Sequence, residues 1–274
     1  MNYPAVSQNI TSEIKNVSGV RLPKQKRSQI SFDQMIKSAM SLLEERGLEA
    51  TTVKNILIHS GAGAGTFYAR FDSRDALLNY LFIEFWEDTE KEWEIILTPP
   101  RWSTASVENI VVQITRTMVL WSQAHSSTLR AFLVYAMCHP EYALLDRTVE
   151  LDNRVAGHVI DLLIEHDDEL THPDLEQAVR LATLQVFATL RSRYIFAWGD
   201  RDDGIEDEKL AVELANIFLS YLGLMGAKRD GSRMDPENKL RVAHMQKIKN
   251  ILAQEGFSIK KASYKKQQMK IPPE

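Results

Sequence analysis

The sequence predicts an all-α protein, and three observations carry that prediction. Apolar residues recur at three- and four-residue steps through most of the chain, which is the spacing of one face of a helix. The alternation of apolar and polar residues that marks a half-buried strand is absent from the sequence. Breaks at His139-Pro140, at His172-Pro173 and from Gly199 to Gly204 divide the chain into segments of helical length. We therefore expect short helices at the amino end, followed by a larger helical body.

The amino end is predicted to hold a basic arm and a first helix. Residues 1–26 lack periodicity and are expected to form a flexible basic arm, whose end overlaps the run Lys24-Gln25-Lys26-Arg27. The first helix is predicted to begin at Ser31, which can form a capping box with Gln34. Gly47 is a suitable carboxy-terminal stop for this helix.

Three further helical segments are expected before residue 100. Thr51 or Thr52 offers an N-cap for a second, shorter helix, and a compact third segment covers residues 66–71. Ser73 is expected to cap a fourth helix, which Thr98-Pro99-Pro100 should end.

The body is predicted to consist of further helices. They are expected at residues 105–124, 127–138, 141–166, 174–198 and 207–226. A last amphipathic stretch at 236–254 precedes a Lys-rich tail. We accordingly divide the chain into the arm (1–26), an amino-terminal domain (27–78), a helical body (79–227) and a basic carboxy-terminal extension (228–274).

Composition and charge narrow the class of protein. The chain has 274 residues, of which 44% are apolar and 26% charged, as is ordinary for a soluble globular protein. The formal charge is +4 over residues 1–74, −15 over 75–227 and +7 over 228–274. Basic ends around an acidic body suggest that a polyanion binds at the ends, with merely solvated basic tails as the alternative. The single Cys138, and the lack of a membrane-length apolar run or a secretory signal, favour a cytoplasmic protein.

The stretch SGAGAGTFYARF, residues 60–71, allows two interpretations. Glycines between a strand and a helix would predict a nucleotide site, but a P-loop needs a Lys after its last glycine, and here Gly65 is followed by Thr66. The third glycine of a dinucleotide turn would also fall on Thr66, and helical patterns flank the stretch where strands are required. A helix-turn-helix explains more residues. Gly61 supplies the positive φ of a tight turn, and the small residues 63–65 let the next helix approach DNA closely.

Residues 27–80 resemble the amino-terminal domain of TetR-family transcriptional regulators. The matching motifs, which align without a gap, are TTVKNI at 51–56, SG at 60–61, GTFYARF at 65–71 and SRDALL at 73–78. The sequence departs from the family at Leu57, where a small Ala is usual, and at Gly63 and Ala64, where Ser and a polar or basic residue are frequent. We therefore expect few base contacts at the start of the recognition helix, and more reliance on phosphates, DNA shape and the basic arm.

The resemblance implies a homodimeric DNA-binding regulator, typically a repressor that a small apolar or aromatic effector releases from double-stranded operator DNA. The residues expected to contact DNA are Lys26, Arg27, Thr51, Thr52, Lys54, Gly63, Ala64, Gly65, Thr66, Tyr68 and Arg70. The residues expected to line an effector pocket are Phe82, Trp86, Met118, Trp121, Phe132 and Tyr135. The residues expected at a dimer interface are Leu175, Val179, Ala182, Val186, Leu190, Leu214 and Phe218.

Alternative interpretations stay open at each of these sites. The pocket and interface residues could instead be buried core, and a protein of this fold could bind DNA or a partner without an effector. An enzyme is not predicted, because the sequence lacks a Gly-x-Ser-x-Gly elbow and a His-Glu-x-x-His pair. The acidic run 200–204 breaks the spacing of a calcium loop, and His166-Asp167-Asp168 with His172 is more typical of a solvated loop than of a metal site. We predict no catalytic residue, metal or cofactor.

Overall fold

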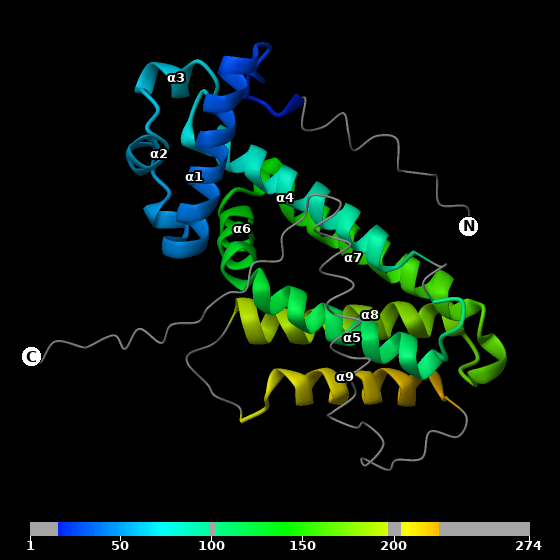
Figure 1. Ribbon diagram of the computed structural model, residues 1–274. Helices are drawn as coiled ribbons and strands as arrows, with labels where there is room; N and C mark the ends of the chain where they lie inside the picture. The colour runs from blue at the N-terminus through cyan, green and yellow to red at the C-terminus, as the bar shows by residue number, and fades with distance from the viewer. Residues whose placement is uncertain (1–15, 99–101, 197–203, 225–274) are drawn as a thin grey trace, which may run out of the picture.

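The computed structural model describes residues 16–98, 102–196 and 204–224. Within these ranges the regular structure is helical apart from one isolated antiparallel bridge between Val20 and Phe71, which confirms the predicted all-α class (Figure 1). The predicted helix at 236–254, the Lys-rich tail and most of the acidic run at 200–204 lie outside the described residues. No helix in the described ranges is long and apolar enough to cross a membrane.

Three helices form the amino-terminal group. They are α1 (Lys26–Ala50), α2 (Val53–Ser60) and α3 (Ala64–Tyr68). Their shared core is aromatic and aliphatic: Phe32 stacks on Phe71 with ring centroids 5.3 Å apart, and Phe67 lies 5.3 Å from the same ring. Because Phe67 and Phe71 have no exposed surface, they are core residues.

The first helix differs from its prediction at both ends. It begins at Lys26, five residues before Ser31, so Lys26 and Arg27 lie in its first turn rather than in an arm. Pro23 keeps the residue before it extended, whereas Lys26 and Arg27 are good helix formers. The helix therefore begins after Pro23. Gly47 (φ 77°, ψ −177°) breaks the helix, and one further turn then continues to Ala50.

The body contains six longer helices, close to the predicted segments. They are α4 (Arg74–Ile96), α5 (Val107–Ala124), α6 (Ser126–Cys138), α7 (Leu144–Ile164), α8 (Leu175–Leu190) and α9 (Asp207–Leu222). Short 3₁₀ turns lie at η5 (Pro140–Tyr142) and η6 (Asp167–Glu169). The predicted helix 174–198 is not uniform, because α8 is followed by a π-helical turn, η7 (Arg191–Ile195).

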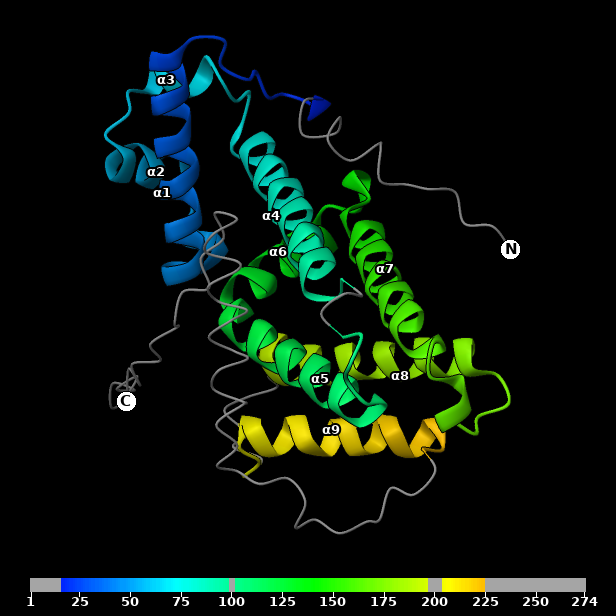
Figure 2. The same ribbon diagram turned by 45° about the vertical axis from the view of Figure 1, so that its right-hand side comes forward.

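The packing of these helices connects the amino-terminal group to the body. α4 runs from the group into the body beside α7, and α6 packs against α1 (Figures 1 and 2). Deeper in the body, α8 packs against α7 and α9, while α5 packs against α9. Both α4 and α6 therefore contact α1 of the amino-terminal group.

Candidate nucleic-acid interface and its supporting body

The turn between α2 and α3 has the geometry of a helix-turn-helix. Thr52 caps α2, its side chain accepting a hydrogen bond from the backbone N–H of Asn55 at 3.2 Å. Gly61 ends α2 in the left-handed conformation (φ 68°, ψ 12°), as its position in the sequence predicted. Gly63 is extended and precedes α3. The turn from α2 to α3 therefore takes three residues, 61–63, as in a helix-turn-helix.

The outer side of this motif is exposed. On α3, the side chain of Phe67 is fully buried, whereas Tyr68 is 55% exposed. The neighbouring predicted contacts are exposed as well. We call this set the recognition surface: Thr52, Lys54, Gly63, Ala64, Gly65, Thr66 and Tyr68. It combines hydroxyl groups, one cation and a backbone without bulky side chains, which is chemistry suited to phosphate and base-edge contacts.

Four predicted contacts lie outside this surface. Lys26 and Arg27 are exposed in the first turn of α1. Arg70 is half-buried, and its Nη1 donates to the carbonyl oxygen of Arg21 at 3.5 Å. The prediction for Thr51 requires correction, because this residue has no exposed surface and its hydroxyl donates to the carbonyl oxygen of Gly47 at 2.9 Å. Thr51 therefore stabilises the break in α1 and does not face outward.

An arginine that the sequence analysis did not single out fastens α4 to the motif. Arg74, the first residue of α4, donates from Nε to the carbonyl oxygen of Thr51 at 2.7 Å and from Nη2 to that of Leu48 at 2.5 Å. These carbonyl groups belong to the last turn of α1 and to its C-cap. The only sequence signal for this role is the position of Arg74 directly after the helix cap Ser73.

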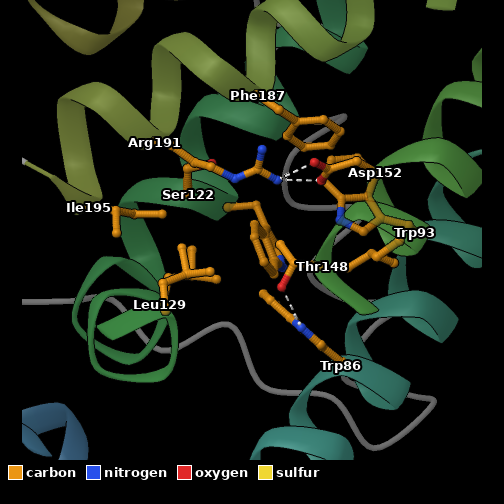
Figure 3. A pocket seen from close by; sticks show the side chains of 12 residues that line it. Trp86, Trp93, Ser122, Leu129, Thr148, Asp152, Phe187, Arg191 and Ile195 are labelled. Carbon is orange, nitrogen blue, oxygen red and sulfur yellow. Dashed lines mark hydrogen bonds and ion pairs between the residues drawn. The ribbon is translucent and has the colours of Figure 1, made fainter. Parts of the chain in front are cut away.

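The body contains a cavity of about 30 Å³, which we call the tryptophan cavity. It is lined by Trp86, Trp93, Trp121, Ser122, Leu129, Leu133, Thr148, Leu151, Asp152, Phe187, Arg191 and Ile195 (Figure 3). Only Trp86 and Trp121 of the six predicted pocket residues are among them. The other four, Phe82, Met118, Phe132 and Tyr135, are buried in the surrounding core, as the alternative interpretation held.

Two pairs of polar side chains line the cavity. Arg191 donates from Nη2 to both carboxylate oxygens of Asp152, and the indole N–H of Trp86 donates to the hydroxyl of Thr148 at 3.1 Å (Figure 3). Burial raises the pKa of Asp152, and the charge of Arg191 opposes that rise. The π-helical turn begins at Arg191, and such turns are frequent at functional sites. Sequence reasoning missed Asp152 because its partner is 39 residues away.

A histidine and a glutamate lie close to this cavity. Glu92 accepts a hydrogen bond from the indole N–H of Trp121 at 3.1 Å, and burial raises the pKa of this carboxyl group. The ring of His125 lies 4.9 Å from that of Trp121, and its Nε2 is buried without a hydrogen-bond partner. Burial lowers the pKa of His125 to about 4. His125 is therefore neutral at physiological pH.

The predicted dimer residues of α8 and α9 are mostly covered by their own chain. Leu175 is half-buried, and the other six are buried: Val179, Ala182, Val186, Leu190, Leu214 and Phe218. Their burial fits the competing interpretation, in which these residues belong to the core of the single chain. The apolar side chains that these helices do expose are Leu181 (52%), Ile217 (51%) and Tyr221 (41%). A groove lined by Ala182, Gln185, Val186, Leu214, Ile217, Phe218 and Tyr221 lies between the two helices.

The histidines considered for a metal site have other partners. Nδ1 of His166 lies 3.1 Å from a carboxylate oxygen of Glu169, and Nδ1 of His172 lies 2.8 Å from the backbone oxygen of Asp174. Among the described residues, no group of three or more His, Cys, Asp or Glu side chains could hold a metal ion.

The class that this geometry defines is an all-helical protein with an amino-terminal helix-turn-helix. The sequence model of the family described as "Bacterial regulatory proteins, tetR family" matches residues 35–81. The similarity to this family therefore concerns the amino-terminal domain, and a repressor shares it over much the same region. It is 31% identical over 78 residues to the HTH-type transcriptional repressor KstR2 of Rhodococcus jostii (strain RHA1). That alignment spans 28% of this chain and only 38% of KstR2.

Solved structures share the fold over a larger part of the chain. A crystal structure from Mesorhizobium loti MAFF303099, described as a candidate TetR-family transcriptional regulator, covers 73% of this chain and all of its own length, with a TM-score of 0.57 and 18% identity. Salmonella enterica GusR covers 73% of this chain and 99% of its own, with a TM-score of 0.52 and 16% identity. At these identities the likeness concerns the fold alone.

Proposed function

We propose that this protein is a transcriptional regulator that binds double-stranded operator DNA as a homodimer, and that it acts as a repressor. The observation that carries the proposal is the two-sided character of α3, in which Phe67 is fully buried while Tyr68 is 55% exposed among small exposed neighbours. A helix with this division is held rigidly from behind and offers its front to a partner. The similarity of the amino-terminal region to the repressor KstR2 supports repression rather than activation.

In the proposed complex, α3 enters the major groove of the duplex. The Thr66 hydroxyl and the Tyr68 phenol can bond to base edges or phosphates, while the small residues 63–65 allow the backbone to come close. Lys54, Lys26 and Arg27 are exposed and would neutralise phosphates. In a two-fold dimer, the second copy of α3 would enter the groove about one helical turn, ~34 Å, away. The acidic body, of formal charge −15, would be kept off the duplex.

Replacement of Tyr68 tests this assignment. Duplexes selected by the wild-type protein from a random-sequence pool would serve as the probe in gel-shift titrations. We expect Tyr68→Ala to weaken binding by roughly 10-fold or more, because a base contact is worth about 1–3 kcal/mol. Tyr142→Ala is the matched control, since Tyr142 is 38% exposed on the 3₁₀ turn η5. Equal affinity of the two variants would contradict the role of α3 as the reader.

The proposed dimer uses the outer side of α8 and α9. Leu181, Ile217 and Tyr221 would meet the same residues of a second copy, and the groove between the helices would receive its side chains. A monomer rarely leaves such an apolar strip beside a groove in contact with water. The buried residues predicted for the interface would then support it from beneath.

Sedimentation velocity can test the dimer. Ile217→Asp places a charge in the proposed interface and should shift the protein towards monomer, because an unpaired charge is costly to bury. Val149→Asp introduces the same charge at a side chain that is 58% exposed on α7, and it should leave the dimer intact. A wild-type protein that sediments as a monomer at micromolar concentration would refute the dimer.

Release by an effector is the finer part of the proposal. The tryptophan cavity has four aromatic side chains and one buried ion pair, a combination that suits a small apolar or aromatic ligand with a polar end. The residue Trp86 is on α4, which also carries Arg74 at the turn of the DNA-binding motif. A ligand that spread α4 from α7 would therefore turn the recognition surface and shift the population away from the DNA-binding form.

The volume of the cavity favours a second candidate, a DNA-binding protein of the same fold without an effector. About 30 Å³ holds one or two water molecules, whereas ligand pockets usually measure roughly 300–1,000 Å³. A thermal-shift screen of small aromatic compounds separates the two candidates. Effector control predicts a compound that raises Tm and releases the selected duplex from the wild type but not from Ser122→Leu, which fills the cavity. The absence of any releasing compound supports the second candidate.

A further inference from the structure

Residues 16–22 form a segment that was expected to belong to a flexible arm, and that instead lies against the chain that leaves α3. We call it the amino-terminal strap. The backbone N–H of Arg21 donates to the carbonyl oxygen of Arg70 at 2.8 Å, and the N–H of Asp72 donates to that of Gly19 at 2.9 Å. These two bonds enclose the bridge between Val20 and Phe71. Val17, Val20 and Leu22 pack against the hydrophobic core, so the strap has an apolar anchor as well.

Arg21 adds a side-chain clamp to these backbone bonds. Its Nη2 pairs with the carboxylate of Asp72, and its Nη1 donates to the carbonyl oxygen of Tyr68 at 3.3 Å. One guanidinium group therefore joins the last residue of α3 to the residue that precedes the cap of α4. The fork of an arginine can hold two such acceptors at once, whereas an ammonium group provides only a single charged point.

Gly19 allows the strap to lie this close. Its φ is +75°, and a Cβ atom added there would lie 3.1 Å from Cβ of Ala76 and 3.4 Å from Cβ of Asp72. A larger residue at this position would be strained in its backbone and would push the strap away from the start of α4.

We propose that Arg21 and Asp72 are positioning residues that fix the orientation of the recognition helix. α3 has only five residues, and a helix of that length is not stable by its own hydrogen bonds. Its direction is therefore set by the core packing of Phe67 and by what holds its two ends. The Gly61 turn holds the first end, and the strap holds the second through Tyr68, Arg70 and Phe71. This inference rests on the proposed function, because it concerns the helix that reads DNA.

A direct phosphate contact by Arg21 is the competing role, since its side chain is 55% exposed. The two roles predict opposite effects of removing the charge of Asp72. If Arg21 positions α3, Asp72→Asn loosens the clamp and weakens binding, even though it removes a negative charge from the DNA-facing domain. If Arg21 binds phosphate, Asp72→Asn frees the guanidinium group and strengthens binding.

The test uses the full chain and a duplex selected by the wild type from a random-sequence pool. We expect Asp72→Asn to weaken binding about 3- to 5-fold, as fits an exposed ion pair. Arg21→Lys should weaken it similarly, despite keeping the charge, and the double variant should bind no more weakly than either single one. Gly19→Ala should lower the affinity with no change in charge. Asp75→Asn, which removes the same charge three residues later, is the matched control and should not weaken binding.

The salt dependence of binding completes the test. The slope of log K against log salt should be unchanged in Arg21→Gln if Arg21 acts by position, and should fall by about 0.9 if it neutralises one phosphate. Wild-type binding together with equal or tighter binding by Asp72→Asn would overturn the inference and leave the proposed function standing. A wild type that selects no duplex would overturn the proposed function itself, and this inference with it.

Discussion

The amino-terminal group and the helical body place their polar residues in opposite ways. In the amino-terminal group the charged side chains of Lys26, Arg27 and Lys54 face outward, and the core around Phe32, Phe67 and Phe71 is aromatic. The body instead buries ionisable groups, among them Asp152, which pairs with the partly buried Arg191. Burying a charge is costly unless it is paired. The amino-terminal group thus carries its charges on its exposed surface, whereas the body encloses ionisable groups whose charge affects its stability.

The largest expected effect concerns the buried ion pair of the body. Asp152→Ala leaves the guanidinium group of Arg191 without its partner, and we expect the free energy of unfolding to fall by roughly 3 kcal/mol or more. Urea unfolding followed by circular dichroism measures it. The double variant Asp152→Leu/Arg191→Met removes both charges and should recover much of the loss. If the free energy of unfolding of Asp152→Ala lay within about 0.5 kcal/mol of the wild-type value, a change typical of surface positions, the ion pair would not stabilise the interior.

Two ionisable groups of the body should give stability opposite dependences on pH. Burial raises the pKa of Glu84 to about 7 and lowers that of His125 to about 4. The folded state thus holds a proton on Glu84 that the unfolded state has lost, so this contribution is full below pH 4.5 and is lost as the pH rises through 7. His125 acts in reverse, because the unfolded state binds its proton first. Its contribution is full above pH 6.5 and is lost as the pH falls towards 4.

The two contributions are separated by one variant each. Each is worth up to about 3 kcal/mol over its range, and they oppose each other between pH 4.5 and 6.5. Glu84→Gln should therefore make stability rise more steeply with pH in this interval, and His125→Phe should make it fall. Urea midpoints at pH 5 and pH 6.5 measure both slopes. If stability depended on pH in the same way in the wild type and in both variants, the two buried groups would not make these contributions, and the contrast between the body and the surface of the amino-terminal group would fail.

Two glycines of the helix-turn-helix test the amino-terminal half of this comparison. Neither Gly61 nor Gly65 has another group within 4 Å of a Cβ atom built on it, so the effect of an alanine there depends on the backbone alone. Gly61 has a φ of +68°, and Gly61→Ala should destabilise the protein by about 1–2 kcal/mol. Gly65 lies within α3, and Gly65→Ala should stabilise it by roughly 0.5–1 kcal/mol.

The effects of the two glycine variants on affinity for the selected duplex should not follow their effects on stability. Gly65→Ala adds a methyl group on the exposed side of α3 and should weaken binding although the protein is more stable. Gly61→Ala should weaken binding in proportion to the lost structure of the turn. Thermal unfolding and gel shifts on the same samples decide this. A stable Gly65→Ala variant with full affinity would mean that the backbone of α3 does not come close to DNA.

Local signals predicted most of the fold. The helix periods, the Ser73 cap and the left-handed turn at Gly61 each depend on residues within a few positions of one another, and each was readable from the sequence. The start of α1 was not, because its first turn is polar and carries no apolar period. The body helices were placed within a few residues, but which of their apolar positions face outward was not predicted, because that depends on how the helices pack.

Local sequence signals did not predict the contacts between residues that lie far apart in the chain. The bond between Arg21 and Asp72 joins residues 51 positions apart, and that between Arg191 and Asp152 joins residues 39 positions apart. Neither pair has a sequence pattern that sets it apart from other charged residues. The same reason explains the predicted pocket, since periodicity marks Phe82 and Trp86 alike as buried, while only the packing decides that Trp86 borders a cavity.

Another expected effect of modest size separates two adjacent threonines that the sequence treated as equivalent. Thr51 is buried and bonded to Gly47, whereas Thr52 is exposed and caps α2. Thr51→Val and Thr52→Ala should each lower the free energy of unfolding by about 1 kcal/mol, the first through a lost internal hydrogen bond and the second through a lost cap. Only Thr52→Ala should also weaken binding to the selected duplex, because only Thr52 belongs to the recognition surface. Equal losses of affinity in two variants that unfold alike would mean that the order of the turn, and not the exposed hydroxyl, limits recognition.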